Sequence, residues 1–360
     1  MPKTKKILFS GGGTLGSVSP LLAIYDVLKE EKIYSFLWVG TSSGPEKNVI
    51  KKEGIKFIEM KGGKLRRYFS LLNFFDIFKI ISDFFKSVSL IKKEKPDLII
   101  SAGSFVSVPL VWAAFLFRVN ILIHQLDFRP GLANKLMAPF AKKITVSFKK
   151  SLKDYGKKAY FTGIPLRRNF LNNYQKENLK EELNLNINLP LVLVVGGGTG
   201  AEKINEMIFE IAPTLIKKTN IIHVCGKNKI KKVSRELEEN YHQYEFLNPN
   251  LMAEYLKKAD LVISRAGLGF LSELAYLKKA SIIIPLPNSH QEDNVQVLIE
   301  RQAALVFYEK NLSTFILSQE IEELLNNKEK RMRLGENIKE SIKSGEDSVS
   351  DIIKIIKEII

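Results

Sequence analysis

Two stretches of the sequence decide the fold: KILFSGGGTLGSVSPLLAI at Lys6–Ile24 and LVLVVGGGTGAEKINEMI at Leu191–Ile208. Each begins with a short apolar run typical of a buried strand, continues through a glycine-rich loop and ends in a helical pattern. This order is typical of a parallel α/β sheet in which the N-terminus of the helix faces an anion. The repeat therefore predicts two doubly wound units in tandem.

Apolar runs of strand length alternate with helical patterns along the rest of the chain, which supports the α/β class. The runs expected to form strands include 6–9, 35–39, 98–101, 120–123, 144–147, 191–195, 221–225, 261–264 and 281–284. We predict two facing Rossmann-like domains, with the ligand in the cleft between them, beyond the carboxyl ends of the strands. The expected boundaries are 1–163, 164–342 and a C-terminal helix at 343–360 that packs back on the first domain.

The composition points to a globular protein with an anionic partner. The 360 residues include 55 Lys+Arg and 39 Asp+Glu, which gives a formal net charge of +16. Such a charge favours nucleic acid, an anionic membrane or phosphorylated substrates, and general lysine enrichment is the alternative explanation. A single cysteine, Cys225, allows no internal disulfide and suits a reducing cytosol. The apolar run after the basic N-terminus is too short for a signal peptide.

One uncharged stretch, LIISAGSFVSVPLVWAAFLF at Leu98–Phe117, has the length of a membrane span. Its first half reads as a strand followed by a glycine turn, and Pro109 lies where a helix begins. We therefore expect a buried strand, a loop and a helix rather than a transmembrane segment.

The glycine loops, GGGTLG at 11–16 and GGGTGA at 196–201, both fit the spacing of dinucleotide-binding loops. In a dehydrogenase, an acidic residue at the end of the strand after each loop's helix would bind the ribose of NAD. Neither of the two strands expected at that place ends in an acid, so a dehydrogenase is disfavoured. Neither loop continues into the Gly-Lys-Ser/Thr of a P-loop. Each loop therefore either holds an anion through its backbone N–H groups or is a tight turn without a ligand.

Several motifs together resemble the MurG family, which adds N-acetylglucosamine to undecaprenyl-pyrophosphoryl-N-acetylmuramoyl-pentapeptide. In chain order they are GGTLGSVSP, SAGSFVSVP, HQLDFRPGLANK, GIPLR, GGGTGAEKIN and, most specific, ADLVISRAGLGFLSELAYLKKASIIIPLPNSHQEDN at 259–294. The resemblance covers nearly the whole chain. It implies a GT-B type architecture and an inverting hexosyltransferase of peptidoglycan synthesis that uses UDP-N-acetylglucosamine, without a metal or cofactor. It also implies a peripheral location on the cytoplasmic face of the cell membrane.

The resemblance also implies which residues bind the two substrates. Those expected to do so are Gly13, Thr14, Gly16, Asn134, Arg167, Gly198, Thr199, Leu247, Arg265, Gly267, Glu273, His290, Gln291 and Asn294. Glu273 is assigned to the ribose hydroxyls, and the HQEDN motif to the donor sugar. From the residues alone, Glu273 is more simply an acid that complements a helix dipole, and HQEDN is equally a polar surface loop.

The chain departs from the family pattern at positions connected with catalysis. Ser17 stands where the family has His, and Gln125 stands where it has Glu. Asp127 is a new carboxylate in the same loop as Gln125. We predict Asp127 as the base that takes the proton from the acceptor hydroxyl, with Ser17 bonding a phosphate. The alternatives are that Asp127 is only a turn residue, or that the chain is a catalytically silent relative.

A lipid-linked acceptor requires contact with a membrane, and the stretch Arg66–Lys93 fits that role. Basic residues flank an apolar set rich in phenylalanine, as in interfacial helices on anionic lipid. The residues expected to touch the membrane are Leu71, Leu72, Phe74, Phe75, Phe78 and Phe85. The alternative is a helix that packs on its own core.

Three other activities remain open at the level of the sequence. They are transfer to another lipid acceptor, epimerisation of UDP-N-acetylglucosamine at C2, and binding without catalysis. The expected partners are UDP-N-acetylglucosamine, the lipid-linked muramoyl-pentapeptide and an anionic membrane surface, and other cell-wall synthesis proteins are further candidates. No nucleic acid is expected.

Overall fold

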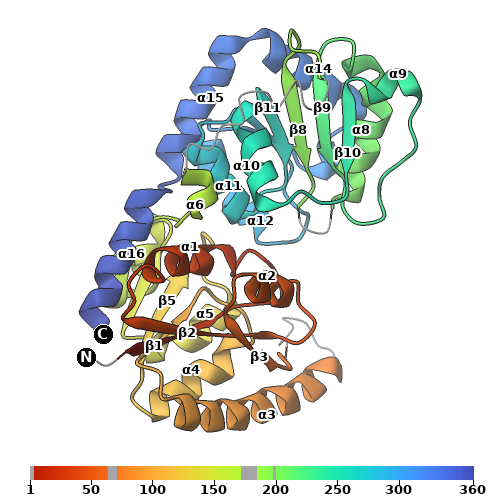
Figure 1. Ribbon diagram of the computed structural model, residues 1–360. Coiled ribbons are helices and arrows are strands. Elements are labelled where there is room, and N and C mark those ends of the chain that lie inside the picture. Colours follow the sequence, from red (N-terminus) through yellow and green to blue (C-terminus); the bar gives the residue numbers. More distant parts are fainter. Residues whose placement is uncertain (1–3, 64–70, 172–184, 198–199) are drawn as a thin grey trace. The chain divides into compact units, whose positions relative to one another are not determined.

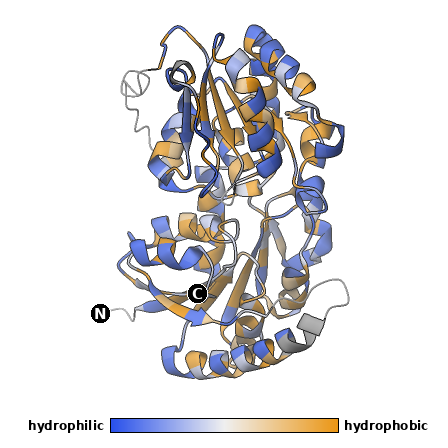
Figure 2. Ribbon diagram, turned by 90° about the vertical axis from the view of Figure 1, so that its right-hand side faces the viewer, coloured by the Kyte–Doolittle hydropathy of each residue, from blue (hydrophilic) through white to orange (hydrophobic). Residues whose placement is uncertain are grey.

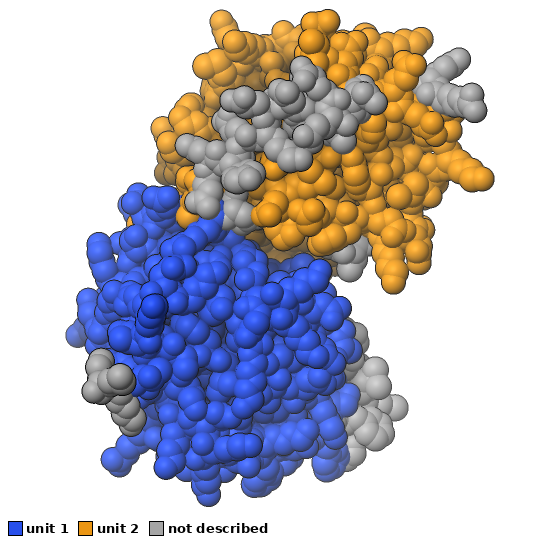
Figure 3. All heavy atoms as spheres, viewed as in Figure 1, with its two compact units in different colours: residues 1–168, 345–360 blue, residues 169–344 orange. Residues whose placement is uncertain are grey.

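The computed structural model describes residues 4–63, 71–171, 185–197 and 200–360 (Figure 1). The chain divides into two compact units, which Figure 3 colours separately. Unit 1 combines Met1–Arg168 with Gly345–Ile360, and unit 2 consists of Asn169–Ser344. The chain therefore leaves unit 1 once, forms unit 2 and returns to unit 1.

Unit 1 is built on a parallel sheet that has seven strands within the described residues, in the order β3-β2-β1-β4-β5-β6-β7. The strands are β1 (Lys5–Ser10), β2 (Tyr34–Thr41), β3 (Lys56–Met60), β4 (Leu98–Ser101), β5 (Asn120–Gln125), β6 (Lys143–Val146) and β7 (Ala159–Phe161). The central strands are apolar on both faces because helices cover both faces of the sheet.

Each face of this sheet has its own core. The helices of unit 1 are α1 (Ser19–Leu28), α2 (Glu46–Lys52), α3 (Leu71–Glu94), α4 (Ser107–Leu116), α5 (Leu132–Met137) and α16 (Glu346–Ile359), with short 3-10 turns at Ala138–Phe140, Lys149–Asp154 and Gly156–Lys158. Ile7 and Phe9 of β1 pack with α1 and α16, whereas Leu8 packs on the opposite face with α4 and α5. The alternation follows from the period of two residues along a strand.

Unit 2 repeats the design with a parallel sheet of order β10-β9-β8-β11-β12-β13. Its strands are β8 (Leu191–Val195), β9 (Asn220–Val224), β10 (Tyr241–Tyr244), β11 (Leu261–Ser264), β12 (Ser281–Ile283) and β13 (Leu305–Val306). Its helices are α8 (Glu202–Leu215), α9 (Arg235–Glu238), α10 (Pro249–Lys258), α11 (Leu268–Tyr276), α12 (Gln291–Asn294), α13 (Gln296–Glu300), α14 (Thr314–Asn326) and α15 (Lys328–Ser341), and the short α6 (Arg168–Leu171) lies at the boundary of the units. Figure 2 shows apolar residues concentrated on the strands of both units.

Both sheets reverse their strand order beside their first strand, between β1 and β4 in unit 1 and between β8 and β11 in unit 2. In doubly wound folds, ligands bind at the carboxyl ends of the strands that flank such a reversal. The loops concerned are 11–18 and 102–106 in unit 1, and 196–201 and 265–267 in unit 2. The fold therefore places both glycine loops where a ligand is expected.

The uncharged stretch at 98–117 forms β4, a turn and α4, as its sequence predicts. None of the described helices combines the length and the apolar character that crossing a bilayer requires.

Candidate functional site

A buried carboxylate fixes the glycine loop that follows β1. Glu46, the first residue of α2, is fully buried. Its Oε1 accepts hydrogen bonds from the backbone N–H (2.7 Å) and the hydroxyl (2.6 Å) of Thr41, and its Oε2 accepts one from the N–H of Gly13 (3.2 Å). A Cβ on Gly12 would lie 2.2 Å from Glu46 Oε1, so a side chain at residue 12 would displace this carboxylate. The end of β2 and the start of α2 therefore set the shape of the loop.

The predicted phosphate-binding groups of this loop differ in their surroundings. Gly13, Thr14 and Gly16 are exposed, and Ser17 is partly buried. The Gly13 N–H is already bonded to Glu46, so the donors left for an anion lie further along the loop. The hydroxyl oxygen of Ser17 is buried and has no hydrogen-bond partner among the described residues. An unsatisfied buried hydroxyl is costly, which supports a ligand contact at this position.

The loop after β5 carries Asp127 and is held by Gln125, the fully buried last residue of that strand. Gln125 Nε2 donates to the carbonyl oxygens of Asp127 (2.7 Å) and Arg129 (3.1 Å). Its Oε1 accepts from Nδ2 of Asn134 on α5 and from the Tyr155 hydroxyl (2.9 Å). Asp127 is partly exposed, and the buried Oδ1 of Asn134 has no partner within the described part of the chain.

The glycine loop and the Asp127 loop lie at the same edge of the sheet, with the loop after β4 between them, because β1, β4 and β5 are neighbours. The Ser10 hydroxyl at the end of β1 donates to the Ser107 hydroxyl (2.8 Å) at the start of α4. Gly103 and Ser104, after β4, have φ angles of +94° and +97°. For a serine this conformation is strained, and such strain concentrates at functional sites. The structure thus brings the predicted acceptor-side residues of unit 1 together.

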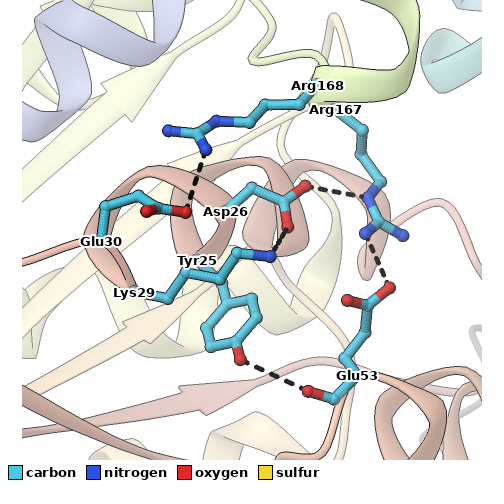
Figure 4. A network of polar contacts seen from close by, with 7 residues as sticks. All are labelled: Tyr25, Asp26, Lys29, Glu30, Glu53, Arg167 and Arg168. Atoms are coloured by element: carbon cyan, nitrogen blue, oxygen red, sulfur yellow. Dashed lines mark hydrogen bonds and ion pairs between the residues drawn. The ribbon is translucent and has the colours of Figure 1, made fainter.

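Arg167 belongs to a network of charged side chains within unit 1 (Figure 4). Its Nε donates to Asp26 Oδ2 (3.2 Å) and its Nη2 to Glu53 Oε1 (2.7 Å). Asp26, on α1, also pairs with Lys29 (3.0 Å), and the neighbouring Arg168 pairs with Glu30 (3.1 Å). Arg167 therefore fastens the segment that follows β7 to α1 and to the end of α2. Its contact with a pyrophosphate stays a prediction, because both carboxylates already occupy its guanidinium.

In unit 2, two predicted donor-site amides join the loops after β11 and β12. Gln291 Oε1 accepts from the backbone N–H groups of Ala266 (3.0 Å) and Leu286 (3.0 Å). Asn294 is fully buried, and its Nδ2 donates to the Ala266 carbonyl (3.2 Å). Its Oδ1 has no partner among the described residues. These amides lie beside Gly267, which precedes the first turn of α11.

Arg265 supports the frame of this site. It is 9% exposed, and its Nη1 donates to the carbonyl oxygens of Ile284 and Pro285 (3.2 Å each). Its Nη2 pairs with Glu309. The side chain therefore ties the end of β11 to the end of β12, and its predicted role at the pyrophosphate remains a prediction.

Glu273 lies on α11 and is partly buried. Burial raises the pKa of its carboxyl to about 8. No side chain or backbone group of the described residues forms a hydrogen bond or an ion pair with that carboxyl. A desolvated carboxyl without a protein partner is a candidate for ligand binding.

The glycine loop of unit 2 approaches the end of β9 closely. Gly198 and Thr199, two predicted ligand residues, lie outside the described residues. Gly200 has a φ of +73°, and a Cβ there would lie 2.2 Å from the carbonyl oxygen of Cys225. Asn205 on α8 donates to the same carbonyl (2.8 Å). The loop is therefore anchored to β9 by backbone contact and by one buried amide.

Behind this anchor lies a buried polar chain of three residues. Asn205 Oδ1 contacts His223 Nε2 (3.0 Å), and His223 Nδ1 contacts the Tyr241 hydroxyl (2.7 Å). Burial lowers the pKa of His223 to about 3, so the ring is neutral. His223 is therefore a packed core histidine with a partner at each ring nitrogen.

The remaining predicted residues of unit 2 differ in exposure. Leu247 is buried immediately before Asn248, the N-cap of α10. His290 is exposed immediately before α12.

Helix α3 presents aromatic side chains outward and acids inward. Phe78 is 58% exposed and Phe85 is 66% exposed, whereas Asp83 is fully buried. Asp83 accepts from the backbone N–H groups of Lys61 (3.1 Å) and Gly62 (2.8 Å) after β3. Figure 2 shows the resulting alternation of apolar and polar residues along α3. The side chains of the other predicted membrane residues lie outside the described part of the chain: Leu71, Leu72, Phe74 and Phe75.

Sequence reasoning missed two residues that shape the site, Glu46 and Tyr155. An acid in the first turn of a helix is common on surfaces, so nothing in the sequence marks Glu46 as buried. Tyr155 reaches Gln125 across 30 residues of chain, and no spacing rule connects them. In both cases only the folded chain shows the contact.

Comparison with known proteins matches both units. The N-terminal domain of glycosyltransferase family 28 matches residues 7–146, and the C-terminal domain of that family matches residues 191–353. The crystal structure of Acinetobacter baumannii MurG aligns with a TM-score of 0.74 at 22% identity, covering 98% of this chain and 99% of that chain. A UDP-GlcNAc 2-epimerase from Neisseria meningitidis aligns with a TM-score of 0.69 at 14% identity over 98% of this chain and all of its own. These likenesses show the fold.

Two sequence relatives are much more similar, and both are named UDP-N-acetylglucosamine–N-acetylmuramyl-(pentapeptide) pyrophosphoryl-undecaprenol N-acetylglucosamine transferase. The protein from Clostridium tetani is 40% identical over 97% of this chain and 98% of its own length. The protein from Borrelia hermsii is 41% identical over 94% of this chain and 93% of its own length. The chain therefore belongs to glycosyltransferase family 28 and, within it, to the MurG family of N-acetylglucosamine transferases.

Proposed function

We propose that this chain transfers N-acetylglucosamine from UDP-N-acetylglucosamine to undecaprenyl-pyrophosphoryl-N-acetylmuramoyl-pentapeptide, converting lipid I to lipid II in peptidoglycan synthesis. The observation that carries the proposal is 40% identity over 97% of the chain to a relative named for this activity. The reaction inverts the anomeric carbon, as the resemblance to the family implies.

Unit 2 is the proposed site of the donor. The first turn of α11 offers backbone N–H groups to the pyrophosphate, and Glu273 on the same helix offers a carboxylate to the ribose hydroxyls. Gln291 and Asn294 hold the adjoining loop, and the unpartnered Oδ1 of Asn294 suits a hydroxyl or an acetamido N–H of the sugar.

Unit 1 is the proposed site of the acceptor. The glycine loop would hold the acceptor pyrophosphate through N–H groups beyond Gly13 and through the hydroxyls of Thr14 and Ser17. Asn134 offers a buried acceptor oxygen at the same edge of the sheet.

The proposed step is a single displacement. The acceptor hydroxyl oxygen forms a bond to the anomeric carbon while the bond from that carbon to the β-phosphate oxygen breaks, and the electron pair leaves with UDP. The hydroxyl proton passes to the Asp127 carboxylate. The N–H groups at the start of α11 stabilise the charge that develops on UDP.

The proposed membrane contact lies on α3 and α4 of unit 1. Besides Phe78 and Phe85, the end of α4 exposes Phe115 (52%) and Leu116 (63%). Lys92 Nζ lies 5.7 Å from the ring centre of Phe117 beside them. Exposed aromatic residues next to lysines are typical of interfacial contact with anionic lipid. The proposal therefore places the protein at the cytoplasmic membrane surface as a peripheral enzyme.

The deciding experiment incubates the protein with labelled UDP-N-acetylglucosamine and lipid-linked muramoyl-pentapeptide, and resolves the products by chromatography. Label is expected in the lipid fraction only when the acceptor is present. Formation of UDP-N-acetylmannosamine without acceptor would indicate a 2-epimerase instead, and no turnover of either kind would indicate a binding protein.

The base is tested in the same assay with Asp127→Asn. This change keeps the shape of the side chain and removes its basicity, so kcat should fall by about 10²–10⁴ while UDP affinity stays as in the parent. A variant that turns over like the parent would assign the base elsewhere, with His290 as the next candidate.

A further inference from the structure

We propose that Gln125 is a positioning residue for the transfer reaction, because its amide fixes the loop that carries Asp127 and leaves Asn134 Oδ1 as an open acceptor beside it. The inference rests on the proposed function. It gives a role to a residue at which the chain departs from the family pattern, and at which loss of activity is the obvious alternative interpretation.

The hydrogen-bonding capacity of the Gln125 amide is fully used. A primary amide has two N–H donors and an oxygen with two lone pairs. Gln125 Nε2 donates to the carbonyls of Asp127 (2.7 Å) and Arg129 (3.1 Å), and Oε1 accepts from Asn134 and Tyr155. Carbonyl oxygens only accept, so the nitrogen must face the loop and the orientation of the amide is determined. These four bonds together hold the Gln125 amide in one orientation.

The same geometry excludes a carboxylate at this position. A glutamate would place a carboxylate oxygen where Gln125 Nε2 now contacts two carbonyl oxygens. It would have to take up a proton to remain, and even then it would supply one donor for two acceptors. The loop that presents Asp127 is therefore built for an amide, and the family's glutamate does not fit it.

Asn134 is oriented by this network. Its Nδ2 donates to Gln125 Oε1, so its Oδ1 points away from that bond. Asn134 is only 6% exposed, and this buried oxygen has no hydrogen-bond partner among the described residues. A buried acceptor without a partner is costly, and an O–H or N–H of the acceptor sugar would satisfy it. The Gln125 amide thus fixes the loop that carries the proposed base and also orients Asn134 Oδ1, which can accept a hydrogen bond from the substrate.

Two titratable side chains adjoin Gln125, those of Tyr155 and His124. Tyr155, between two 3-10 turns, has its pKa raised by burial and by Asp154, so its hydroxyl keeps its proton. His124, the preceding residue of β5, has its pKa lowered to about 4 by burial and is neutral. Asp127 and Arg129 meet the amide through their backbone carbonyls. A carboxyl introduced at position 125 would therefore add a titrating group between side chains that keep their charge state.

The test is Gln125→Glu, with kcat/KM for the lipid acceptor measured from pH 6 to pH 9 and divided by the parent value at each pH. The ratio should fall by about tenfold or more as the new carboxyl loses its proton. UDP affinity, measured by calorimetry, should match the parent throughout. Tyr155→Phe removes only a donor to Oε1, so its ratio should stay constant with pH.

The matched control is Asn220→Asp in unit 2. Asn220, the first residue of β9, is also fully buried, and its Nδ2 donates to the carbonyls of Asn186 (2.9 Å) and Leu189 (3.1 Å) ahead of β8. With the folded fraction followed by circular dichroism, this variant should keep the parent kcat/KM per folded molecule at every pH.

The outcomes separate the two proposals. A parent that does not transfer sugar would overturn the proposed function and, with it, the role of Gln125. If the parent is active, two results would overturn the role of Gln125 alone. One is a ratio of kcat/KM for Gln125→Glu over the parent that does not fall by pH 9. The other is a fall in that ratio no larger than the fall for Asn220→Asp.

Discussion

Among single residues, Glu273 has a carboxyl that is shielded from water and forms no hydrogen bond or ion pair within the described part of the protein. Burial raises its pKa to about 8, so at neutral pH the free protein holds mostly the protonated form. A pair of ribose hydroxyls would donate to the carboxylate and favour its ionised form. Donor binding should therefore be coupled to the release of a proton from this residue.

We predict that UDP affinity increases from pH 6 to pH 8, by at most about tenfold per pH unit, and that Glu273→Gln removes this dependence. The variant should also bind UDP more weakly at pH 8, because bonds to a carboxylate contribute about 1.5–3 kcal/mol. Isothermal titration over this range measures both effects. A parent affinity that does not change with pH would separate Glu273 from the ribose.

The same variant has a predicted effect on the stability of the free protein. The pKa of Glu273 is higher in the folded chain than the ordinary 4.5, so the folded state binds more protons between these values and the parent loses stability as the pH rises. Below pH 4 the penalty is absent, because both states are protonated. The unfolding free energy of Glu273→Gln relative to the parent should therefore rise between pH 5 and pH 8 in urea titrations.

Glu46 leads to a prediction about the first glycine loop. Glu46→Gln places an N–H donor opposite the N–H of either Gly13 or Thr41. The variant should therefore lower the free energy of unfolding by about 1–3 kcal/mol. It should also raise the KM for the lipid acceptor and leave UDP binding unchanged. Thr41→Val is the matched control, because it removes one bond to Glu46 and leaves the bond to Gly13. Equal acceptor KM values for the two variants would show that the loop does not need this anchor.

Among the elements, the sequence predicts the central strands and misses all four edge strands. The edges are β3 and β7 in one sheet and β10 and β13 in the other. Their sequences are KFIEM, AYF, YHQY and LV. An edge strand has one neighbour and an exposed side, so it is short or polar and lacks the continuous apolar run that marks a strand covered on both faces.

Some residues of the candidate site can likewise be predicted from the sequence, and others cannot. Gln291, Asn294 and Asn134 belong to motifs that the resemblance to the family singles out, and these motifs follow β12 in unit 2 and β5 in unit 1. The burial of Glu46, and the two carboxylates that occupy Arg167, depend on contacts between distant parts of the chain. Periodicity and motif spacing describe neighbours along the chain, and these contacts are not local.

Helix α3 departs at several positions from the usual polarity of a surface helix. Asp76 and Asp83 are buried, while Phe78, Ile81 and Phe85 are exposed. Water solvates such an aromatic face poorly, and a lipid surface accommodates it.

We predict that Phe78→Ser combined with Phe85→Ser lowers partitioning onto anionic vesicles by about tenfold or more, since a fully buried phenylalanine contributes about 1.5–3 kcal/mol. UDP binding should be unaffected. Phe315→Ser on α14 of unit 2 is the matched control, because Phe315 is 68% exposed. Vesicle sedimentation measures the effect, and equal partitioning of both variants would assign the aromatic face of α3 another role.

At the scale of the whole molecule, α16 completes unit 1 although unit 2 precedes it in the chain. Val349, Ile352, Ile356 and Ile359 are buried in the core that α16 shares with α1. Lys357 pairs with Glu31 (2.7 Å) just beyond α1. The helix is therefore part of the first core.

We predict that deletion of residues 345–360 prevents stable folding of unit 1. Each aliphatic side chain lost from the core removes about 1.5–3 kcal/mol, and the sum is comparable to the whole stability of a typical domain. Limited proteolysis should then cleave unit 1 rapidly while unit 2 resists. Lys354→Ala, an exposed change on the same helix, should leave the pattern of the parent. A resistant unit 1 in the deletion variant would contradict this prediction.

The position of α16 also has a consequence for synthesis on the ribosome. The residues of unit 2 emerge after most of unit 1, yet unit 1 cannot close its core until residues 345–360 have been translated. Unit 2 can therefore finish folding first. Until α16 has been translated, the face of the unit 1 sheet that this helix covers stays partly exposed. A chaperone that binds apolar surface has its target on this face during translation. A ribosome that stops within unit 2 releases a chain that quality-control proteases can recognise.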